Sequence, residues 1–261
     1  MSKEFDVKNA YSVRDKVIIV TGGGTGIGKV YSQRLAEGGA KVVLADIAAD
    51  ESNVVAAKIR DAGGQALSVP TDVTDEAAVQ AMADAAANEF GGIDGLINNA
   101  SLMSVLPRGD WFEISADRWD SVMSVNLKGI FLCCRAVYSY MQERGGGSIV
   151  NISSSRIWEG NPNRLDYTTS KAGVVGLTRA LAREIGDDNI SVNAITPGLT
   201  MSETQLASSS SNYLGGKDER KCFKRPQTPD DLVGAVIFLL SDAAAFMTGQ
   251  TVNVDGGTYM H

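Results

Sequence analysis

The sequence predicts an α/β fold in which seven parallel strands form one doubly wound sheet with helices on both faces. Short β-branched runs alternate with longer segments rich in Ala, Glu, Arg and Leu along almost the whole chain. The runs mostly lack the in-and-out alternation of a half-exposed strand, which suits a sheet covered on both faces. Such strand–helix–strand repetition predicts right-handed crossovers and a parallel sheet. The predicted strands are Val17–Val20, Val42–Ala45, Ala66–Val69, Ile93–Ile97, Ser148–Ile152, Ser191–Ile195 and Thr251–Val254.

Two of the intervening segments are clearly helical. The first is Asp75–Phe90, with Asp75 as the predicted N-cap and Gly91-Gly92 as the predicted stop, and the second is Thr168–Ile185. No repeat or linker divides the chain, so we expect one domain over residues 1–261. The segment at about 201–229 breaks the rhythm by turning polar after a strand end, where ligands bind in parallel sheets. We expect a substrate lid there; the alternative is a solvated insertion.

Composition excludes several classes of function. The chain has 24 Lys and Arg against 31 Asp and Glu, a net charge of −7, which argues against nucleic-acid binding because that needs a basic face. The one histidine is the terminal residue His261, which rules out a histidine triad and a multi-histidine metal site, and we expect no metal. Three cysteines form neither a C-x-x-C pair nor a disulfide framework. Without a secretory leader or a membrane-spanning apolar stretch, a cytoplasmic location is expected.

A glycine loop follows the first strand and opens a helix over Thr21–Gly28. Glycines there let the backbone turn sharply and approach a pyrophosphate, while the helix N-terminus supplies N–H groups. The pattern departs from G-x-G-x-x-G because Ile27 takes the place of the third glycine. A P-loop nearly fits but fails at Val30, where a hydroxyl should meet magnesium. The loop alone leaves both nucleotide classes open.

Asp46 helps to separate these classes. It ends the second strand, 18 residues past Gly28, close to the spacing of a ribose-binding carboxylate. There it would bind the adenosine hydroxyls and repel a 2′-phosphate, and Thr25 rather than a basic residue precedes Gly26. We therefore expect NAD in preference to NADP. The alternative is a magnesium-binding acid in an NTPase.

Tyr167 and Lys171 stand four residues apart in a helical segment. This spacing places them on one helix face, where the ammonium would lower the tyrosine pKa from about 10. The hydroxyl would then serve as a general acid/base near neutral pH. Ser154, at the end of the fifth strand, would meet the same rim of the sheet and donate a hydrogen bond to a substrate oxygen. Alternatively, Ser153–Ser155 are ordinary turn residues.

Together these features resemble the short-chain dehydrogenase/reductase family, in its single-domain branch. The resemblance covers Lys16 to Gly257 and implies a Rossmann-type fold. It rests on T-G-x-x-x-G-x-G at Thr21–Gly28, Asp72-Val73, Asn98-Asn99-Ala100, Asn126, Ser154, Tyr167-x-x-x-Lys171 and Pro197-Gly198.

The resemblance also implies the roles of these residues. Tyr167 would be the catalytic acid/base, Ser154 would polarise the substrate oxygen, and Lys171 would hold the nicotinamide ribose. Asn126 would bind a water that links Lys171 to solvent; otherwise it is a polar residue at a helix turn. Asp72 would receive the adenine amino group. The implied cofactor-binding set is Gly22, Thr25, Gly26, Ile27, Gly28, Asp46, Ile47, Asp72, Val73, Asn98, Ala100, Tyr167, Lys171, Pro197, Gly198, Thr200 and Ser202.

Three departures qualify the resemblance to the family. Ser101 replaces the glycine of N-N-A-G, and Ser202 stands where a carboxamide-binding threonine is common. Enoyl reductases of this fold place the lysine seven residues after the tyrosine. Here the spacing is four, which favours carbonyl and alcohol chemistry over C=C reduction.

The expected reaction is hydride transfer between NAD and a secondary alcohol or ketone. Residues expected in the substrate pocket are Arg156, Trp158, Leu102, Met103 and Leu165, which favour a hydrophobic, cyclic or aromatic substrate. Arg156 would grip a carboxylate or, alternatively, form an outward surface salt bridge. Two alternatives to this function are a 3-oxoacyl-carrier-protein reductase and a non-catalytic NAD-binding regulator. The resemblance further suggests a homotetramer built through helices at about Asp120–Arg144 and Thr168–Ile185 and the last strand.

Overall fold

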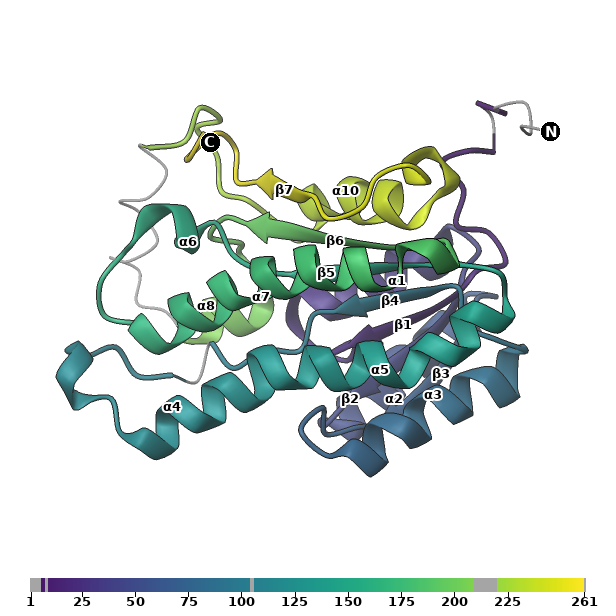
Figure 1. Cartoon of the computed structure of the whole chain (residues 1–261), viewed down its shortest axis with the longest axis horizontal. Helices are drawn as coiled ribbons and strands as arrows, with labels where there is room; N and C mark the ends of the chain where they lie inside the picture. The colour runs from purple at the N-terminus through teal and green to yellow at the C-terminus, as the bar shows by residue number, and fades with distance from the viewer. Residues whose placement is uncertain (1–5, 8, 104–105, 209–219, 261) are drawn as a thin grey trace.

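The computed structural model shows a single seven-stranded parallel sheet with the strand order β3-β2-β1-β4-β5-β6-β7 (Figure 1). It describes residues 6–7, 9–103, 106–208 and 220–260. The doubly wound α/β prediction is confirmed. The strands are β1 (Val17–Thr21), β2 (Lys41–Asp46), β3 (Gln65–Pro70), β4 (Gly95–Asn98), β5 (Gly147–Ile152), β6 (Ile190–Pro197) and β7 (Thr251–Val254).

Each predicted strand corresponds to an observed one, but β4 begins at Gly95 instead of Ile93. The reason is the side chain of Asp94, whose Oδ2 atom accepts a hydrogen bond from the Val17 N–H at 2.8 Å. The sheet ladder between β1 and β4 then starts at the pair Ile18 and Gly95. Ile93 is fully buried in one of the apolar cores without belonging to the strand.

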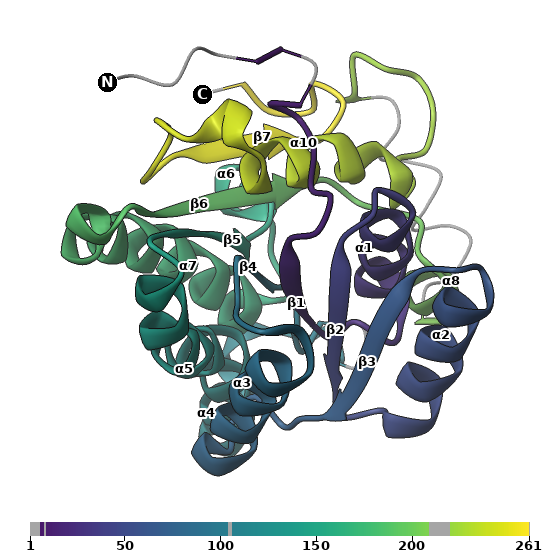
Figure 2. The same ribbon diagram turned by 90° about the vertical axis from the view of Figure 1, so that its right-hand side faces the viewer.

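Helices cover both faces of the sheet (Figure 2). One layer contains α3, α4, α5 and α7, and the opposite layer contains α1, α2 and α10, so two apolar cores form on either side. The main helices are α1 (Gly26–Glu37), α2 (Ala49–Asp61), α3 (Glu76–Phe90), α4 (Ala116–Met123), α5 (Gly129–Glu143), α7 (Leu165–Glu184) and α10 (Asp230–Leu240). Shorter elements are α6 (Arg156–Glu159), α8 (Glu203–Ser208) and the π-helical segment η2 (Ser124–Lys128).

The predicted helix signals are confirmed at α3. The Asp75 carboxylate accepts hydrogen bonds from the N–H groups of Ala77 at 2.8 Å and Ala78 at 3.3 Å. Gly91 ends the helix in the left-handed conformation, with φ of 86°. The second predicted helix begins earlier than Thr168, at Leu165, which places Tyr167 in the first turn of α7.

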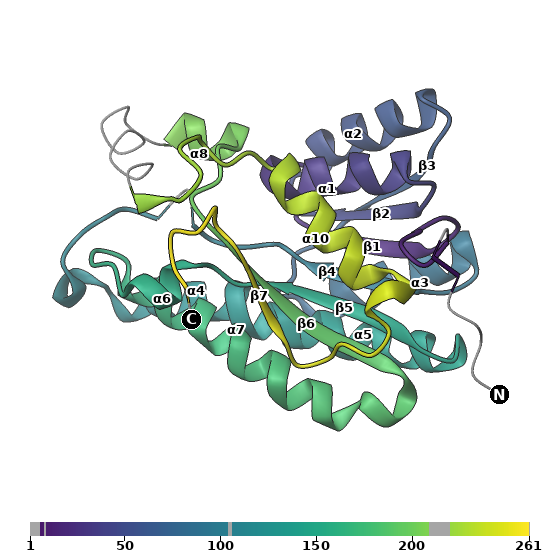
Figure 3. The same cartoon turned by 90° about the horizontal axis from the view of Figure 1, so that it is seen from above.

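None of the helices in the described ranges is long and apolar enough to cross a membrane. The expected lid at 201–229 is described only in part. Its first half contains α8, which lies beside the start of α1 (Figure 3), whereas 209–219 lies outside the described residues, as does His261.

Candidate active site

A cavity of about 520 Å³ opens at the carboxyl ends of the strands, as expected for a parallel sheet. Most of the predicted site residues line it: Gly22, Thr25, Gly26, Ile27, Asp46, Ile47, Asp72, Val73, Ala100, Leu102, Met103, Ser154, Arg156, Tyr167, Lys171, Pro197, Gly198, Thr200 and Ser202. Five predicted residues are not in its lining: Gly28, Asn98, Asn126, Trp158 and Leu165.

The glycine loop leaves donors for an anion at the start of α1. Gly22 and Gly26 have φ of 63° and 55°, values that favour glycine. The N-cap Thr25 makes no side-chain capping bond, and the first turn of α1 carries no acidic residue of its own. N–H groups at a helix N-terminus without a side-chain cap can bind a pyrophosphate, so the loop fits a dinucleotide.

Gly28 lies behind the loop rather than in the cavity lining. A Cβ atom there would lie 2.0 Å from the carbonyl oxygen of Gly22 and 2.5 Å from Nδ2 of Asn99. Gly28 therefore serves the close packing of α1 against the loop.

Asp46 is placed where the sequence predicts, at the end of β2, and is only 6% exposed. Its Oδ2 atom accepts a hydrogen bond from the Gly24 N–H at 2.8 Å, and its Oδ1 atom accepts one from the Ala48 N–H at 2.9 Å. The carboxylate thus ties the glycine loop to the β2 end while lining the cavity. The Asp72 carboxylate, farther along the same rim, accepts hydrogen bonds from the N–H and hydroxyl of Thr74.

The structure corrects the placement of Asn98. Its side chain turns into the core, where Nδ2 donates to Oδ1 of Asn151 at 2.8 Å and contacts the sulfur of Cys134 at 3.4 Å. The next residue, Asn99, lines the cavity instead and donates to the carbonyls of Thr21 and Gly22. Successive residues at a strand end point to opposite sides, and the sequence motif alone did not settle which of the two faces the cavity.

Tyr167, Ser154 and Lys171 all line this cavity. The Nζ atom of Lys171 donates to the carbonyl of Ile152 at 2.8 Å and lies 5.9 Å from the centroid of the Tyr167 ring. Burial lowers the pKa of Lys171 to about 7, because removing the ammonium from water disfavours its charged form. The Ser154 hydroxyl accepts a hydrogen bond from the N–H of Arg156 at 3.3 Å, so its proton remains for a ligand.

Asn126 is fully buried in η2, one layer behind the cavity. Its Oδ1 atom accepts from the N–H of Leu102 at 2.7 Å, and its Nδ2 atom donates to the carbonyl of Leu102 and to the hydroxyl of Ser170. A π-helical turn inside a helix often marks a functional site. Here it delivers an amide side chain to the loop that borders the cavity.

The substrate end differs from expectation at three residues. The Arg156 guanidinium donates to the carbonyls of Asn161 at 3.0 Å and Pro162 at 2.6 Å and to the hydroxyl of Thr168 at 3.3 Å. All of these acceptors are neutral, and Arg156 forms no ion pair with any described residue, so the alternative of an outward salt bridge is not observed. Trp158 and the 47%-exposed Leu165 stand outside the cavity lining.

Several lining residues were missed by the sequence interpretation. Arg164, 8% exposed, donates to the carbonyls of Met103 at 2.8 Å and Leu106 at 3.2 Å, joining the start of α7 to the loop after β4. From α8, Thr204 lines the cavity, and Glu203 reaches the N-terminus of α1. No local pattern marks these residues, because their partners are distant in sequence.

Comparison with known proteins identifies the family. The family model described as enoyl-(acyl carrier protein) reductase matches residues 22–259. An uncharacterized oxidoreductase of Mycobacterium tuberculosis is 45% identical over 242 residues, which cover 93% of this chain and 96% of the relative. The chain belongs to the short-chain dehydrogenase/reductase family. The P-loop alternative for the glycine loop does not fit this family.

Two further matches bear on the type of reaction. A probable galactose dehydrogenase of Rhizobium meliloti is 41% identical over 249 residues, which cover 95% of this chain and 96% of the relative. A solved 7α-hydroxysteroid dehydrogenase, in complex with NADH and 7-oxo glycochenodeoxycholic acid, superposes with a TM-score of 0.91 at 31% identity, covering 97% of this chain and 98% of that one. This member of the short-chain dehydrogenase/reductase family is thus an oxidoreductase that acts on CH–OH groups with a nicotinamide cofactor.

Proposed function

We propose that this short-chain dehydrogenase interconverts a secondary alcohol and a ketone, with NAD as the preferred cofactor and Tyr167 as the acid/base. The observation that carries the proposal is the grouping of Tyr167, Ser154 and Lys171 on one cavity beside the glycine loop. A hydroxyl, a second hydroxyl and a buried amine supply proton transfer, orientation and charge without a histidine.

In the oxidation direction, the phenolate oxygen of Tyr167 takes the proton of the substrate alcohol and becomes the neutral hydroxyl. Ser154 donates to the same substrate oxygen and holds it beside Tyr167. Lys171, when protonated, stabilises the phenolate form of Tyr167 through its charge and would hold the nicotinamide ribose. The bound nicotinamide supplies the hydride acceptor, and the chain supplies position and charge. Asn126 holds the carbonyl and N–H of Leu102 and so keeps the loop beside this site in place.

Asp46 supports the preference for NAD over NADP. Its buried carboxylate lines the cavity at the end of β2, where it would accept hydrogen bonds from the adenosine ribose and repel a 2′-phosphate. The predicted cofactor residues other than Gly28 and Asn98 line the same cavity, and we assign to Asn99 the place first given to Asn98.

The substrate end favours a hydrophobic cyclic or aromatic alcohol. Leu102, Met103 and Leu199 contribute apolar surface near Ser154 and Tyr167. Arg156 adds a charge whose hydrogen-bond partners among the described residues are all neutral, which favours a carboxylate on the substrate. Comparing a neutral ketone with its carboxylated analogue, in the native protein and in Arg156→Met, tests this point. A carboxylate-specific loss of kcat/KM in the variant supports it, and an equal change for both substrates refutes it.

The experiment that tests the main proposal is Tyr167→Phe. Turnover of secondary alcohols with NAD should fall roughly a thousandfold, because a general acid/base contributes about that much. NADH binding, followed by fluorescence, should persist. Retained turnover would refute the assignment of Tyr167. A native protein that binds NADH and turns over no alcohol or ketone would instead support a non-catalytic NAD-binding regulator.

A 3-oxoacyl-carrier-protein reductase would share the same tyrosine, serine and lysine. Parallel assays with NAD and NADP discriminate it, since the carboxylate of Asp46 disfavours NADP. The four-residue spacing of Tyr167 and Lys171 favours CH–OH chemistry over the enoyl reduction named in the family description.

We also propose a homotetramer built through α5, α7 and β7. The half-exposed ring of Phe131 on α5 supports it, because burial in an interface would remove this apolar surface from water. A monomer in light scattering would refute it.

A further inference from the structure

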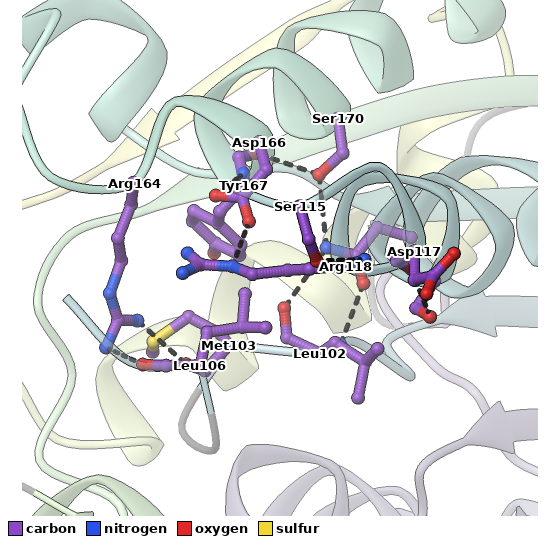
Figure 4. A network of polar contacts seen from close by, with 12 residues as sticks. Leu102, Met103, Leu106, Ser115, Asp117, Arg118, Arg164, Asp166, Tyr167 and Ser170 are labelled. Atoms are coloured by element: carbon purple, nitrogen blue, oxygen red, sulfur yellow. Dashed lines mark hydrogen bonds and ion pairs between the residues drawn. The ribbon is translucent and has the colours of Figure 1, made fainter. Parts of the chain in front are cut away.

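The residue directly before Tyr167 is a fully buried carboxylate that the proposed mechanism does not use. Asp166 lies in the first turn of α7 and has no solvent exposure. Its Oδ1 atom accepts a hydrogen bond from the Tyr167 N–H at 2.8 Å, and its Oδ2 atom pairs with Nε of Arg118 at 2.7 Å (Figure 4). Arg118 comes from α4, and its side chain is 18% exposed.

A buried ion pair is a costly way to hold two helices together. Both charges lose their hydration, and apolar side chains of similar size often stabilise a fold as well or better. Breaking such a pair leaves one uncompensated charge inside the protein. Packing of α4 against α7 alone therefore does not explain the ion pair between Asp166 and Arg118.

The backbone of Tyr167 is held from both ends. Asp166 accepts its N–H, and the Ser170 hydroxyl donates to its carbonyl at 2.7 Å. Ser170 in turn accepts from Nδ2 of Asn126 at 3.1 Å, and Asn126 holds the N–H and carbonyl of Leu102 on the cavity loop. A continuous chain of hydrogen bonds thus joins α4, the start of α7 and the loop beside the substrate end (Figure 4).

We propose that Asp166 and Arg118 are positioning residues that fix the place of Tyr167 and whose opposite charges cancel beside it. This proposal rests on the proposed function, in which Tyr167 is the acid/base. Because Asp166 is fully buried and the Arg118 side chain is only 18% exposed, an unmatched charge there would act on the Tyr167 hydroxyl more strongly than a charge in water would. Arg118 alone would favour the phenolate, and Asp166 alone would disfavour it.

Other charged groups border the same cavity, and they are the same in the native protein and in variants of Asp166 and Arg118. Lys171 comes from α7, Arg164 directly precedes that helix, and Arg156 and Glu159 come from α6. Arg108 comes from the loop after β4, and Asp46 and Asp72 lie at the far, glycine-loop half. A shift that reverses sign between two single variants cannot come from this constant background.

The test is the pH dependence of kcat/KM for alcohol oxidation in Asp166→Asn, Arg118→Gln and the double variant. The limb that is absent in Tyr167→Phe reports Tyr167. Asp166→Asn should move this limb to lower pH and Arg118→Gln to higher pH, each by roughly half a unit to one unit. The double variant, which is neutral again, should return close to the native profile. Each single variant should also lower kcat, with the Kd of NADH unchanged.

Arg118→Lys keeps the charge and loses the planar guanidinium, so it should lower kcat without moving the limb. If Arg118→Gln fails to fold, Arg118→Lys and Asp166→Asn are compared instead: the limb should move to lower pH only in Asp166→Asn. Equal shifts in the same direction, or loss of thermal stability with an unmoved profile in both charge-changing variants, would overturn the proposal. Failure of the proposed function has a different signature: the native protein would oxidise no alcohol, or Tyr167→Phe would retain activity.

Discussion

The Nζ atom of Lys171 lies 5.9 Å from the centroid of the Tyr167 ring, one helical turn farther along α7. Its side chain is fully enclosed, and the carbonyl of Ile152 accepts its hydrogen bond at 2.8 Å. No carboxylate of the described residues pairs with this amine, so its desolvation is offset only by a neutral acceptor. The site therefore contains a lysine that is costly to charge, beside the tyrosine whose charge it is proposed to stabilise.

The first prediction concerns the stability of Lys171→Met. Because the lysine pKa is about 7 in the folded protein against 10.5 ordinarily, the unfolded chain binds more protons between these values. The free energy of unfolding then rises with pH from about 7 to 10.5, and this group adds no pH dependence below 7. At pH 7 the methionine variant should be more stable, by on the order of 4 kcal/mol, because each pKa unit corresponds to about 1.4 kcal/mol.

Chemical denaturation at several pH values between 7 and 9.5 measures this effect. The difference in the free energy of unfolding between Lys171→Met and the native protein should shrink as the pH rises, because deprotonating the native lysine on folding then requires less free energy. A constant difference between the two proteins across this range would contradict the prediction. Turnover should be lost in the variant at every pH, in keeping with the usual conflict between stability and function at a site.

A second prediction concerns the glycine behind the cofactor loop. In Gly28→Ala the new Cβ would meet the Gly22 carbonyl oxygen at 2.0 Å, so the loop must move. We expect NADH binding to be lost and the melting temperature to fall, as measured by fluorescence titration and thermal unfolding. Gly234→Ala is the matched control, because Gly234 lies exposed in α10 with open space around its Cβ position. That change should stabilise the helix by up to about 1 kcal/mol, and equal behaviour of the two variants would refute the steric explanation.

Local features of the fold could be predicted from the sequence alone. Strands and helix caps are local features, so the apolar runs and the capping carboxylate of Asp75 were predicted almost to the residue. Which residue at a strand end faces the cavity depends on contacts with other segments. Asn98 and Asn99 are adjacent amides, and the hydrogen bond from Asn98 to Asn151 decides which one turns inward.

Contacts between distant segments could not be predicted, because no local pattern in the sequence marks the two partners. Arg118 and Asp166 are 48 residues apart, and neither belongs to a recognisable motif. Arg156 could be assigned to the cavity by its place after Ser154, but its hydrogen bonds to the turn at Asn161 and Pro162 depend on how that turn folds. The sequence thus identified the chemistry, and the structure identified what holds it in place.

A third prediction concerns cofactor preference. Asp46→Ala removes the proposed ribose acceptor and the bonds to Gly24 and Ala48. We expect kcat/KM with NAD to fall about ten- to a hundredfold, since hydrogen bonds to a charged group carry about that much free energy. The value with NADP should fall less or rise. Asp50→Asn, an exposed acid on α2 with the same change in net charge, should leave the ratio between cofactors unchanged. An unchanged ratio in Asp46→Ala would contradict the assignment.

The last prediction concerns Glu203, whose carboxylate occupies the N-terminus of α1. Its Oε1 atom accepts from the Gly26 N–H at 3.4 Å, and its Oε2 atom pairs with Nζ of Lys29 at 2.8 Å. The hydrogen bond from Lys29 lowers the pKa of Glu203, so the group is charged at neutral pH. A dinucleotide pyrophosphate is expected at the same helix N-terminus, and two anions at one helix end repel each other. Cofactor binding should therefore break the contact between Glu203 and Gly26.

Glu203→Gln should accordingly bind NADH more tightly, by roughly two- to fivefold at low ionic strength, the effect of one charge at a helix end. Fluorescence titration measures the Kd, and added salt should narrow the difference by screening these partly exposed groups. Glu37→Gln is the control, because it makes the same charge change at the opposite end of α1, where Glu37 pairs with Arg34. Weaker NADH binding by Glu203→Gln would show the reverse relationship, in which the carboxylate, through Lys29, fastens α8 over the bound cofactor instead of competing with it.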